Sequence, residues 1–361
     1  PNTARISRVS STALISKRTR KKSKNRSEKG RDIVSQMICL EQAAKFLSDA
    51  QDILILTHKS PDGDTIGSAF ALMHALHRLG KRADVLCQDP IAPYYSYLFE
   101  NGKYDTTLEN LPFEPKTLVS VDVADQKLLG EKLSQYADRI DLSVDHHASN
   151  TGYAKQLLLR SDAAANCELM LDLIEAMGVK LDQQIVDSLY TGIVTDTGCF
   201  RYPSTTVQTH IAAQKLLLAG AQMRLIHRLM LESTSRGKVQ LICDALHSLR
   251  YELDGKCAVI SLMRDRINEL QVTDDELEGL SSLPRSIEGV QVGVTLRQFK
   301  SYQGYKISVR TDTTVDACAI CKRLGGGGHA GAAGCTVEGK DVTLEQAYQK
   351  ILESVRVELC Q

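Results

Sequence analysis

The chain has 361 residues, of which 43% are hydrophobic and 24% are charged, and its formal net charge is zero. This composition is typical of a soluble globular protein and excludes collagen-like, coiled-coil and wholly disordered chains. The length is too great for one small core and predicts two domains of ordinary size. No run approaches the roughly 18 apolar residues of a transmembrane helix, so we expect no membrane contact.

The basic residues gather at the start of the chain. Residues 1–36 contain eleven Lys or Arg and two Asp or Glu, a net charge of +9 that the remainder balances with −9. The segment is Ser-rich and has no hydrophobic period, which predicts a disordered tail, and it lacks the apolar region of a secretory signal. Three interpretations of this segment stay open: a transit peptide, a nucleic-acid-binding arm or a translated upstream extension. The last is open because Met37 begins an expected amphipathic helix and is an alternative natural start.

The ten cysteines are spread along the chain without the spacing of a disulfide framework. This usage is typical of a reducing cytosol and predicts a cytoplasmic protein. Cys318 and Cys321 are the one close pair. Because no second CxxC accompanies them, two buried thiols on a helix are a better interpretation than a zinc site.

From Met37 to residue 230, strand patterns alternate with helical patterns. Short apolar runs predict strands, and a 3.6-residue period followed by glycine predicts helices. The expected strands are 53–56, 83–87, 117–123 and 140–145, and the expected helices are 66–79, 164–178 and 184–197. This alternation predicts an α/β domain whose mostly parallel sheet carries helices on both faces.

The pattern changes near residue 230. A helix over 236–252 is expected to connect the domains, and strong two-residue alternation then predicts further strands, followed by two helices around a Gly-rich turn. These strands are 256–262, 289–299 and 305–311, and the helices are 315–323 and 343–358. We therefore expect a basic tail (1–36), a catalytic domain (37–230), a helical linker (231–254) and a smaller α+β domain (255–361), with a cleft between the two domains.

Asp and His residues recur where the predicted strands end, the edge at which open α/β sheets bind ligands. They are His58, Asp62, Asp64, Asp122, Asp145, His146 and His147, and Asp196, where the predicted helix 184–197 runs into a loop, is expected to join them. Mixed carboxylate and imidazole ligands suit Mn²⁺, with Mg²⁺, Co²⁺ and Zn²⁺ as alternatives. The ligands suffice for two ions, an arrangement that activates water for phosphoryl displacement. The remaining histidines near helices are interpreted as structural: His74, His77, His210, His227 and His247.

Residues 325–334 read GGGGHAGAAG. Consecutive glycines expose backbone N–H groups to an anion. The segment lacks the Lys-Ser/Thr of a P-loop and does not follow a strand as a dinucleotide fingerprint does. We expect it to hold a phosphate or a nucleotide terminus through backbone amides and His329.

Five motifs together resemble one family. THKSPDGDTIGS, LVSVDVAD, VDHHASN and GIVTDTG resemble the four motifs of the DHH phosphoesterase superfamily, and GGGGHAGAAG resembles the signature of the DHH-associated nucleic-acid-binding domain. The resemblance covers nearly all of residues 37–361, in the right order. The two-domain length is most similar to the bacterial bifunctional oligoribonucleases and PAP phosphatases. That similarity implies hydrolysis of very short RNA to mononucleotides and of 3′-phosphoadenosine 5′-phosphate (PAP) to AMP, in a homodimer.

The resemblance also implies the role of each residue. His58, Asp62 and Asp122 would hold one Mn²⁺, and Asp64, Asp122, His146 and Asp196 the second, with Asp122 bridging. The remaining implied catalytic residues are Asp145, which would orient an imidazole, and His147, which would touch the scissile phosphate or assist proton transfer. The implied substrate-binding residues are Gly326, Gly327, Gly328, His329, Arg310 and Arg201.

Several alternatives stay open within and beyond this family. A cyclic-dinucleotide phosphodiesterase of the membrane-bound kind would carry transmembrane and sensor segments. A RecJ-like exonuclease usually carries an additional OB-type domain, and the related pyrophosphatases have a different second domain. A catalytically inactive RNA-binding module is disfavoured, because every ligand position is filled. The sequence does not rank short RNA, PAP and linear or cyclic dinucleotides as substrates.

Overall fold

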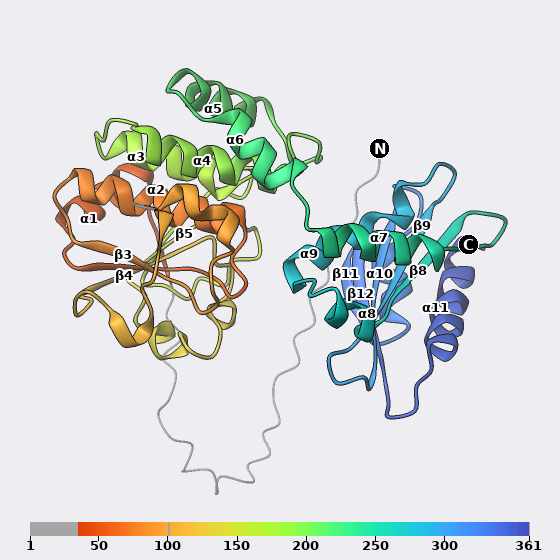
Figure 1. The fold of residues 1–361 in the computed structure, drawn as a ribbon. Helices are drawn as coiled ribbons and strands as arrows, with labels where there is room; N and C mark the ends of the chain where they lie inside the picture. Colours follow the sequence, from red (N-terminus) through yellow and green to blue (C-terminus); the bar gives the residue numbers. More distant parts are fainter. Residues whose placement is uncertain (1–34, 100–101, 361) are drawn as a thin grey trace, which may run out of the picture.

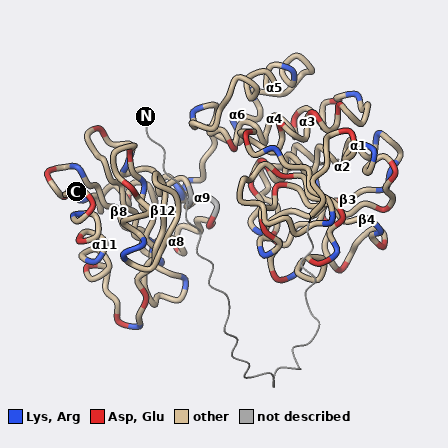
Figure 2. Tube along the Cα trace, turned by 180° about the vertical axis from the view of Figure 1, so that it is seen from behind, with Lys and Arg blue, Asp and Glu red and all other residues tan. Residues whose placement is uncertain are grey.

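The computed structural model describes residues 35–99 and 102–360, so most of the predicted basic tail lies outside the described residues. Within these ranges the chain forms two bodies, each built around a six-stranded sheet (Figure 1). Lys and Arg are scattered among Asp and Glu over both bodies (Figure 2). No helix among the described residues is long and apolar enough to cross a membrane.

The first sheet is wholly parallel, with strand order β1-β6-β5-β4-β2-β3. Its strands are β1 (Gln36–Met37), β2 (Ile53–Leu56), β3 (Ala83–Leu86), β4 (Thr117–Val121), β5 (Leu142–Asp145) and β6 (Gln156–Leu159). Every residue of β2, β4 and β5 is buried, as in a parallel sheet covered on both faces. The four predicted strands are confirmed within a few residues at their ends, whereas β1 and β6 were not predicted.

The two faces of this sheet carry different kinds of helix. Ile53 and Ile55 face a large core to which four α-helices contribute together with helices further along the chain, while Leu54 and Leu56 face a smaller core with two 3-10 helices. The α-helices are α1 (Leu40–Asp49), α2 (Gly63–Arg78), α3 (Asn166–Ala176) and α4 (Gln183–Asp196), and the 3-10 helices are η4 (Gln126–Leu129) and η5 (Ser134–Arg139). Helical cover on both faces is thus confirmed, although on one face it is short and 3-10 in geometry.

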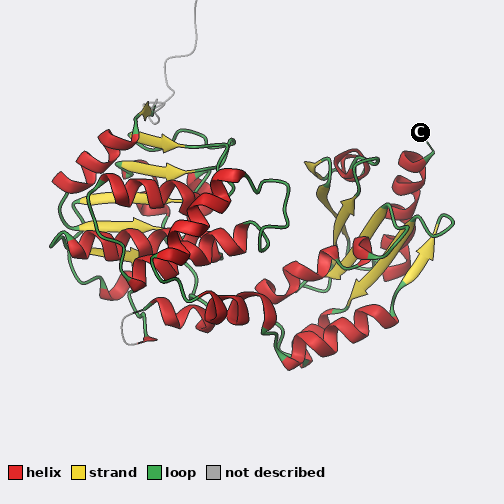
Figure 3. Ribbon diagram, turned by 90° about the horizontal axis from the view of Figure 1, so that it is seen from above, coloured by secondary structure: helices red, strands yellow, loops and turns green. Residues whose placement is uncertain are grey.

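A helical stretch connects the two bodies (Figure 3). It comprises α5 (Val207–Leu218), α6 (Met223–His227), the π-helical turn η6 (Arg228–Glu232) and α7 (Arg236–His247). The predicted helix over 236–252 is wrong in its last residues. There, β7 (Arg250–Glu252) pairs antiparallel with the next strand and becomes the edge of the second sheet.

The second sheet is mixed, with order β11-β12-β10-β9-β8-β7, and only β8 and β9 are parallel. The further strands are β8 (Cys257–Leu262), β9 (Val292–Gln298), β10 (Gly304–Thr311), β11 (Gly327–His329) and β12 (Ala332–Glu338). One face packs on α10 (Ala317–Lys322) and α11 (Leu344–Leu359). At β8 the other face packs on α7, α8 (Arg264–Glu269), α9 (Asp274–Glu278) and η7 (Gly279–Ser282).

The Gly-rich segment is not the turn between two helices that the sequence predicts. It forms the edge strand β11, a two-residue turn and the start of β12. Close packing explains the glycines: a Cβ at Gly326 would lie 2.2 Å from the carbonyl oxygen of Gly334. Gly328 has a φ of 144°, and a Cβ there would lie 2.6 Å from the carbonyl oxygen of Ala332.

Candidate metal centre and substrate cleft

The predicted Asp and His residues meet at the carboxyl edge of the first sheet. Asp62 is the N-cap of α2, where its side chain accepts hydrogen bonds from the backbone of Asp64 and Thr65. Asp122 follows β4 directly, and Asp196 is the last residue of α4. The fold therefore brings residues more than 130 positions apart in the sequence to one place.

Three overlapping groups of potential metal ligands form there, and within each group the ligand atoms lie within 4.8 Å of one another. The groups are His58–Asp62–Asp122, Asp64–His146–Asp196 and Asp122–His146–His147. Asp122 and His146 each belong to two groups, so the three groups form one connected cluster of ligands. All six predicted metal ligands are thus brought together.

Asp122 lies at the centre of this cluster. It has a φ of 58°, which is strained for a residue other than glycine, and its side chain is 3% exposed. Its Oδ2 accepts a 2.6 Å hydrogen bond from the hydroxyl of Thr65. Its Oδ1 has no hydrogen-bond partner among the described residues, although the nearest imidazole nitrogens of His146 and His147 lie 3.4 and 3.5 Å away. An orphaned buried carboxylate oxygen among imidazoles fits a bound cation.

Asp64 is fully enclosed and is held by the start of α3. The backbone N–H groups of Asn166 and Cys167 donate to its two oxygens. Burial, together with the negative charges of Asp122 and Asp196, raises the pKa of Asp64 well above its ordinary value. A Cβ on Gly192 of α4 would lie 2.6 Å from Asp64 Oδ1, so only glycine fits there.

The two histidine ligands are oriented by backbone carbonyls. The Nδ1 atoms of His58 and His146 lie 2.8 and 3.1 Å from the carbonyl oxygens of Lys59 and Ala163, which turns each Nε2 toward the carboxylates. This is the usual arrangement for metal-binding imidazoles. Burial opposes protonation of both rings, but hydrogen bonds and charges from Asp62 on His58 and from Asp122 and Asp64 on His146 outweigh it. They raise the pKa of His58 to about 9 and that of His146 to about 10.

Asp145 belongs to none of the three groups. It is fully buried, and its Oδ1 lies 2.8 Å from His147 Nδ1 and accepts the backbone N–H of His146 and His147. Its Oδ2 accepts a 2.6 Å hydrogen bond from Asn150. The hydrogen bond that His147 donates to the Asp145 carboxylate raises the pKa of His147, and burial opposes this shift. Asp145 therefore orients His147, and Asn150, which lies in the quoted VDHHASN segment without an assigned role, completes that support.

The second domain presents a basic surface toward the loop that carries His58. A cavity of 310 Å³ is lined by Ser60 of that loop and by Arg297, Lys306 and Arg310 on β9 and β10. We call it the cationic cavity. Asp274 also lines the cavity, 2.5 Å from Lys300 and 3.8 Å from Arg297, so among the described lining residues three basic side chains face one acidic one. The strand register explains the cluster, because Lys306 pairs with Arg297 and Arg310 follows at an even spacing on the same face.

The Gly-rich strand extends this face. His329 is paired with Ala332, and Ala332 with Arg310, so the three lie in one row across β11, β12 and β10. His329 is exposed, and the small residue between it and Arg310 leaves the surface open to a ligand. Gly327 shares this face, whereas Gly326 and Gly328 serve the close packing described above. No contact among the described residues joins His329 to the metal cluster.

Arg201 lies in a strained loop behind Asp196. Gly198, Cys199 and Phe200 have φ values of 54°, 59° and 62°. Arg201 Nε donates to the carbonyl oxygen of Gly198, and the side chain has no contact with the cluster in the part of the chain that the structure describes.

The remaining sequence predictions concern cysteines and structural histidines. Cys321 is buried and Cys318 is partly buried on α10, and no ligand group among the described residues contains a cysteine. The five histidines interpreted as structural also lie outside these groups. Four of them are within hydrogen-bond distance of a carbonyl or hydroxyl oxygen, and the fifth stacks on a phenyl ring: His74, His77, His227 and His247, and His210.

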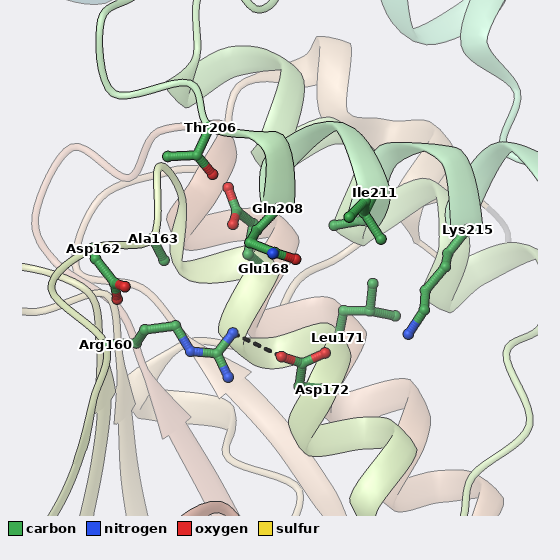
Figure 4. A pocket seen from close by; sticks show the side chains of 11 residues that line it. Arg160, Asp162, Ala163, Glu168, Leu171, Asp172, Thr206, Gln208, Ile211 and Lys215 are labelled. Atoms are coloured by element: carbon green, nitrogen blue, oxygen red, sulfur yellow. Dashed lines mark hydrogen bonds and ion pairs between the residues drawn. The ribbon is translucent and has the colours of Figure 1, made fainter.

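A further cavity of 450 Å³ lies between α3 and α5 (Figure 4). Its two basic residues are already paired, Arg160 with Asp172 at 2.7 Å and Lys215 with Glu175 at 2.9 Å. The lining contains Asp162, Glu168 and Asp172, so its acidic residues outnumber its basic ones and it is less suited to a phosphate than the cationic cavity. Its link to the cluster is structural, because Ala163 on its wall holds His146.

Comparison with known proteins agrees with this geometry. Residues 52–193 match the family model described as DHH family, N-terminal domain, and residues 254–359 match the DHHA1 domain. The chain belongs to the DHH family of phosphoesterases. The donor set and the family together imply that the cluster takes divalent metal ions.

The relatives to which the chain is similar over most of its length include several named NrnA. The bifunctional oligoribonuclease and PAP phosphatase NrnA of Thermus thermophilus is 34% identical over 309 residues, which cover 85% of this chain and 90% of that protein. The probable NrnA of Streptococcus mutans is 26% identical and covers 78% of this chain and 88% of its own. An exopolyphosphatase-related protein from Bacteroides fragilis has the same fold, with a TM-score of 0.77, 24% identity and coverage of 88% and 95%.

Proposed function

We propose that this protein hydrolyses short oligoribonucleotides to mononucleotides and PAP to AMP. The observation that carries the proposal is the sharing of Asp122 between ligand groups, opposite a basic surface of the second domain. The names of the NrnA relatives supply the substrate class. A homodimer and a cytoplasmic location are further expectations from that resemblance.

We assign the cluster to two Mn²⁺ ions, with Mg²⁺ or Co²⁺ as alternatives. His58, Asp62 and Asp122 would hold one ion, and Asp64, Asp122, His146 and Asp196 the other. The unpartnered Oδ1 of Asp122 and the mixed imidazole and carboxylate donors support this assignment. When bound, such a pair of ions supplies an activated water and neutralises the phosphate oxygens.

His147 is the group of this chain that is best placed to move a proton. Asp145 fixes its Nδ1, and the side chain is 43% exposed, so the ring reaches the open side of the cluster. Because the hydrogen bond to Asp145 raises the pKa of His147, its ring stays protonated up to a higher pH than a free imidazole does. We assign to it contact with the scissile phosphate and protonation of the departing O3′.

The cationic cavity and the adjoining row of Arg310 and His329 would hold the 5′-phosphate of the substrate. Arginine donates two parallel hydrogen bonds to phosphate oxygens, and the exposed N–H groups of the edge strand β11 add donors. A substrate anchored there reaches the metal cluster with its 3′-phosphate or its first phosphodiester, which accounts for action on both PAP and short RNA.

A substrate panel with added Mn²⁺ tests this proposal. It comprises 5′-phosphorylated diadenylate, PAP, cyclic diadenylate and long single-stranded DNA. We expect turnover of the first two and little of the others. Preferred cleavage of cyclic diadenylate would favour the cyclic-dinucleotide alternative, and preferred cleavage of the long strand would favour a RecJ-like exonuclease. Asp172→Asn, outside the cluster, is the matched control for Asp122→Asn, which we expect to be inactive.

A further inference from the structure

A third cavity, of 610 Å³, adjoins the metal cluster at Thr195 and shares the wall formed by α9 with the cationic cavity. One wall is residues 90–95, which read PIAPYY, and the opposite wall is the connecting segment at 229–235. We call it the tyrosine cavity. Among the described residues its charged lining is limited to Lys238 and Glu276, which carry opposite charges and give no excess of positive charge, unlike the cationic cavity. Its volume and mixed aromatic and hydroxyl lining fit an uncharged organic group.

The aromatic wall is held in place before any ligand arrives. Tyr94 is 40% exposed and its ring lies 4.6 Å from that of Tyr95, which is 4% exposed. Both belong to the 3-10 helix η1 (Pro93–Leu98), and further along it the hydroxyl of Tyr97 lies 2.6 Å from Thr191 Oγ1 on α4. Tyr94 is therefore an exposed ring on a fixed support, as a stacking platform requires.

The cavity is directly connected to the ligands of the cluster. Thr195, which lines it, precedes Asp196 in α4 and lies against Gly63 between Asp62 and Asp64. A Cβ on Gly63 would lie 2.3 Å from Thr195 Oγ1, so the two helices are in close contact. Ser60 of the same loop lines the cationic cavity, so both cavities adjoin the loop that carries the metal ligands.

We propose that the tyrosine cavity binds the second nucleoside of a dinucleotide, the one joined through its 5′ oxygen to the scissile phosphate. Its base stacks on Tyr94, and the hydroxyls of Ser233 and Thr234 on the opposite wall face the sugar. Aromatic rings bind any base through its π-face, which gives affinity without sequence preference. This inference rests on the proposed function, because it takes the substrate to be a nucleotide.

The chemistry of the two substrates makes the inference specific. Conversion of PAP to AMP breaks the bond between phosphorus and O3′, and water supplies the oxygen that stays on phosphate. The same cleavage in a dinucleotide leaves the phosphate on the second nucleoside and releases the first with a free 3′-hydroxyl. PAP has no second nucleoside, so the tyrosine cavity contributes to dinucleotide binding alone.

The test compares Tyr94→Ala, Tyr94→Phe and wild type on 5′-phosphorylated diadenylate, on its analogue without the second base, and on PAP. Loss of base stacking predicts that Tyr94→Ala raises the KM for diadenylate about 10- to 100-fold. Tyr94→Phe keeps the ring and should restore the wild-type KM. On the analogue without the base, Tyr94→Ala and wild type should have the same KM. Tyr251→Ala, at an exposed tyrosine of β7, is the matched control.

The outcomes separate the two claims. If wild type hydrolyses PAP and diadenylate but Tyr94→Ala leaves the diadenylate KM unchanged, or raises the PAP KM equally, the second nucleoside does not bind at Tyr94. If wild type hydrolyses neither substrate, the proposed function is wrong and the inference falls with it. A melting temperature equal to that of wild type excludes misfolding of the variant. Equilibrium binding of diadenylate without divalent metal should weaken by the same factor as the KM.

Discussion

Replacement of Thr65 by valine removes one hydrogen bond from the centre of the cluster and little else. Thr65 is fully buried in the first turn of α2, and its hydroxyl donates to Asp122 Oδ2 at 2.6 Å. Its backbone N–H donates separately to Asp62, and valine keeps that bond. Valine has nearly the same shape as threonine, so the main change is at the carboxylate of Asp122.

The expected magnitude follows from the charge on the acceptor. A hydrogen bond to a charged group contributes about 1.5–3 kcal/mol, and about 1.4 kcal/mol corresponds to a tenfold change in affinity. Loss of a partner that orients a metal ligand typically weakens metal binding about 10- to 100-fold. We therefore expect Thr65→Val to bind Mn²⁺ at least tenfold more weakly than wild type.

The assay is equilibrium binding of Mn²⁺, with turnover as a second readout. Thr65→Ser is the matched control, because it keeps the hydroxyl and removes only a methyl group. That deletion costs about 1 kcal/mol of stability but should leave metal affinity near that of wild type. Equal Mn²⁺ affinity for Thr65→Val and wild type would refute the claim that this hydrogen bond orients Asp122 for metal.

Three further predictions follow from other features. Gly192→Ala places a Cβ 2.2 Å from Cys167 Sγ and 2.6 Å from Asp64 Oδ1. The free energy of unfolding, measured with urea, should therefore fall by about 1–3 kcal/mol. An unchanged urea midpoint would contradict this close packing. In the metal-free protein the pKa values of His58 and His146 are raised to about 9 and 10, so both rings are protonated at neutral pH and must lose a proton to bind Mn²⁺. Calorimetry should therefore show proton release on binding, and the affinity for Mn²⁺ should rise as the pH rises toward 9. An affinity that does not change with pH would count against both histidines as ligands. Turnover should fall steeply for RNA longer than about five nucleotides, because the metal cluster and the cationic cavity bind the substrate at a fixed separation. The chain beyond residue 36 also has a net charge of −9 and attracts a long polyanion little. Equal degradation of a long RNA by protein lacking residues 1–36 would overturn this prediction.

The sequence predicted the first domain well because its signals are local. Runs such as ILIL at 53–56 are apolar on both faces and give a strand in any parallel sheet. Strand β1 has two residues, which is too short for any pattern, and β6 (QLLL) was missed although it is as long as β2; these two strands pair at the sheet edge, where the outer residues of β6 are only partly buried. The Gly-rich segment was mistaken for a turn because glycines carry no side-chain period, and its strand character comes from pairing with β12.

The metal cluster could be predicted because ligand-bearing loops follow strands that share one edge. The side chains that orient the metal cluster through hydrogen bonds could not be predicted. Thr65 and Asn150 lie inside recognised motifs, but their hydrogen bonds to Asp122 and Asp145 depend on how α2 and the loop after β5 meet. The tyrosine cavity joins residues 94 and 234, whose proximity no local pattern encodes.

The most direct test of the two-metal assignment is the number of Mn²⁺ ions bound per chain, measured by equilibrium dialysis alongside turnover of PAP. The shared position of Asp122 predicts two ions per chain in wild type, with activity appearing as the second ion binds. Asp122→Asn should bind fewer ions and show no turnover. Full activity with one bound ion, or in Asp122→Asn, would contradict the assignment.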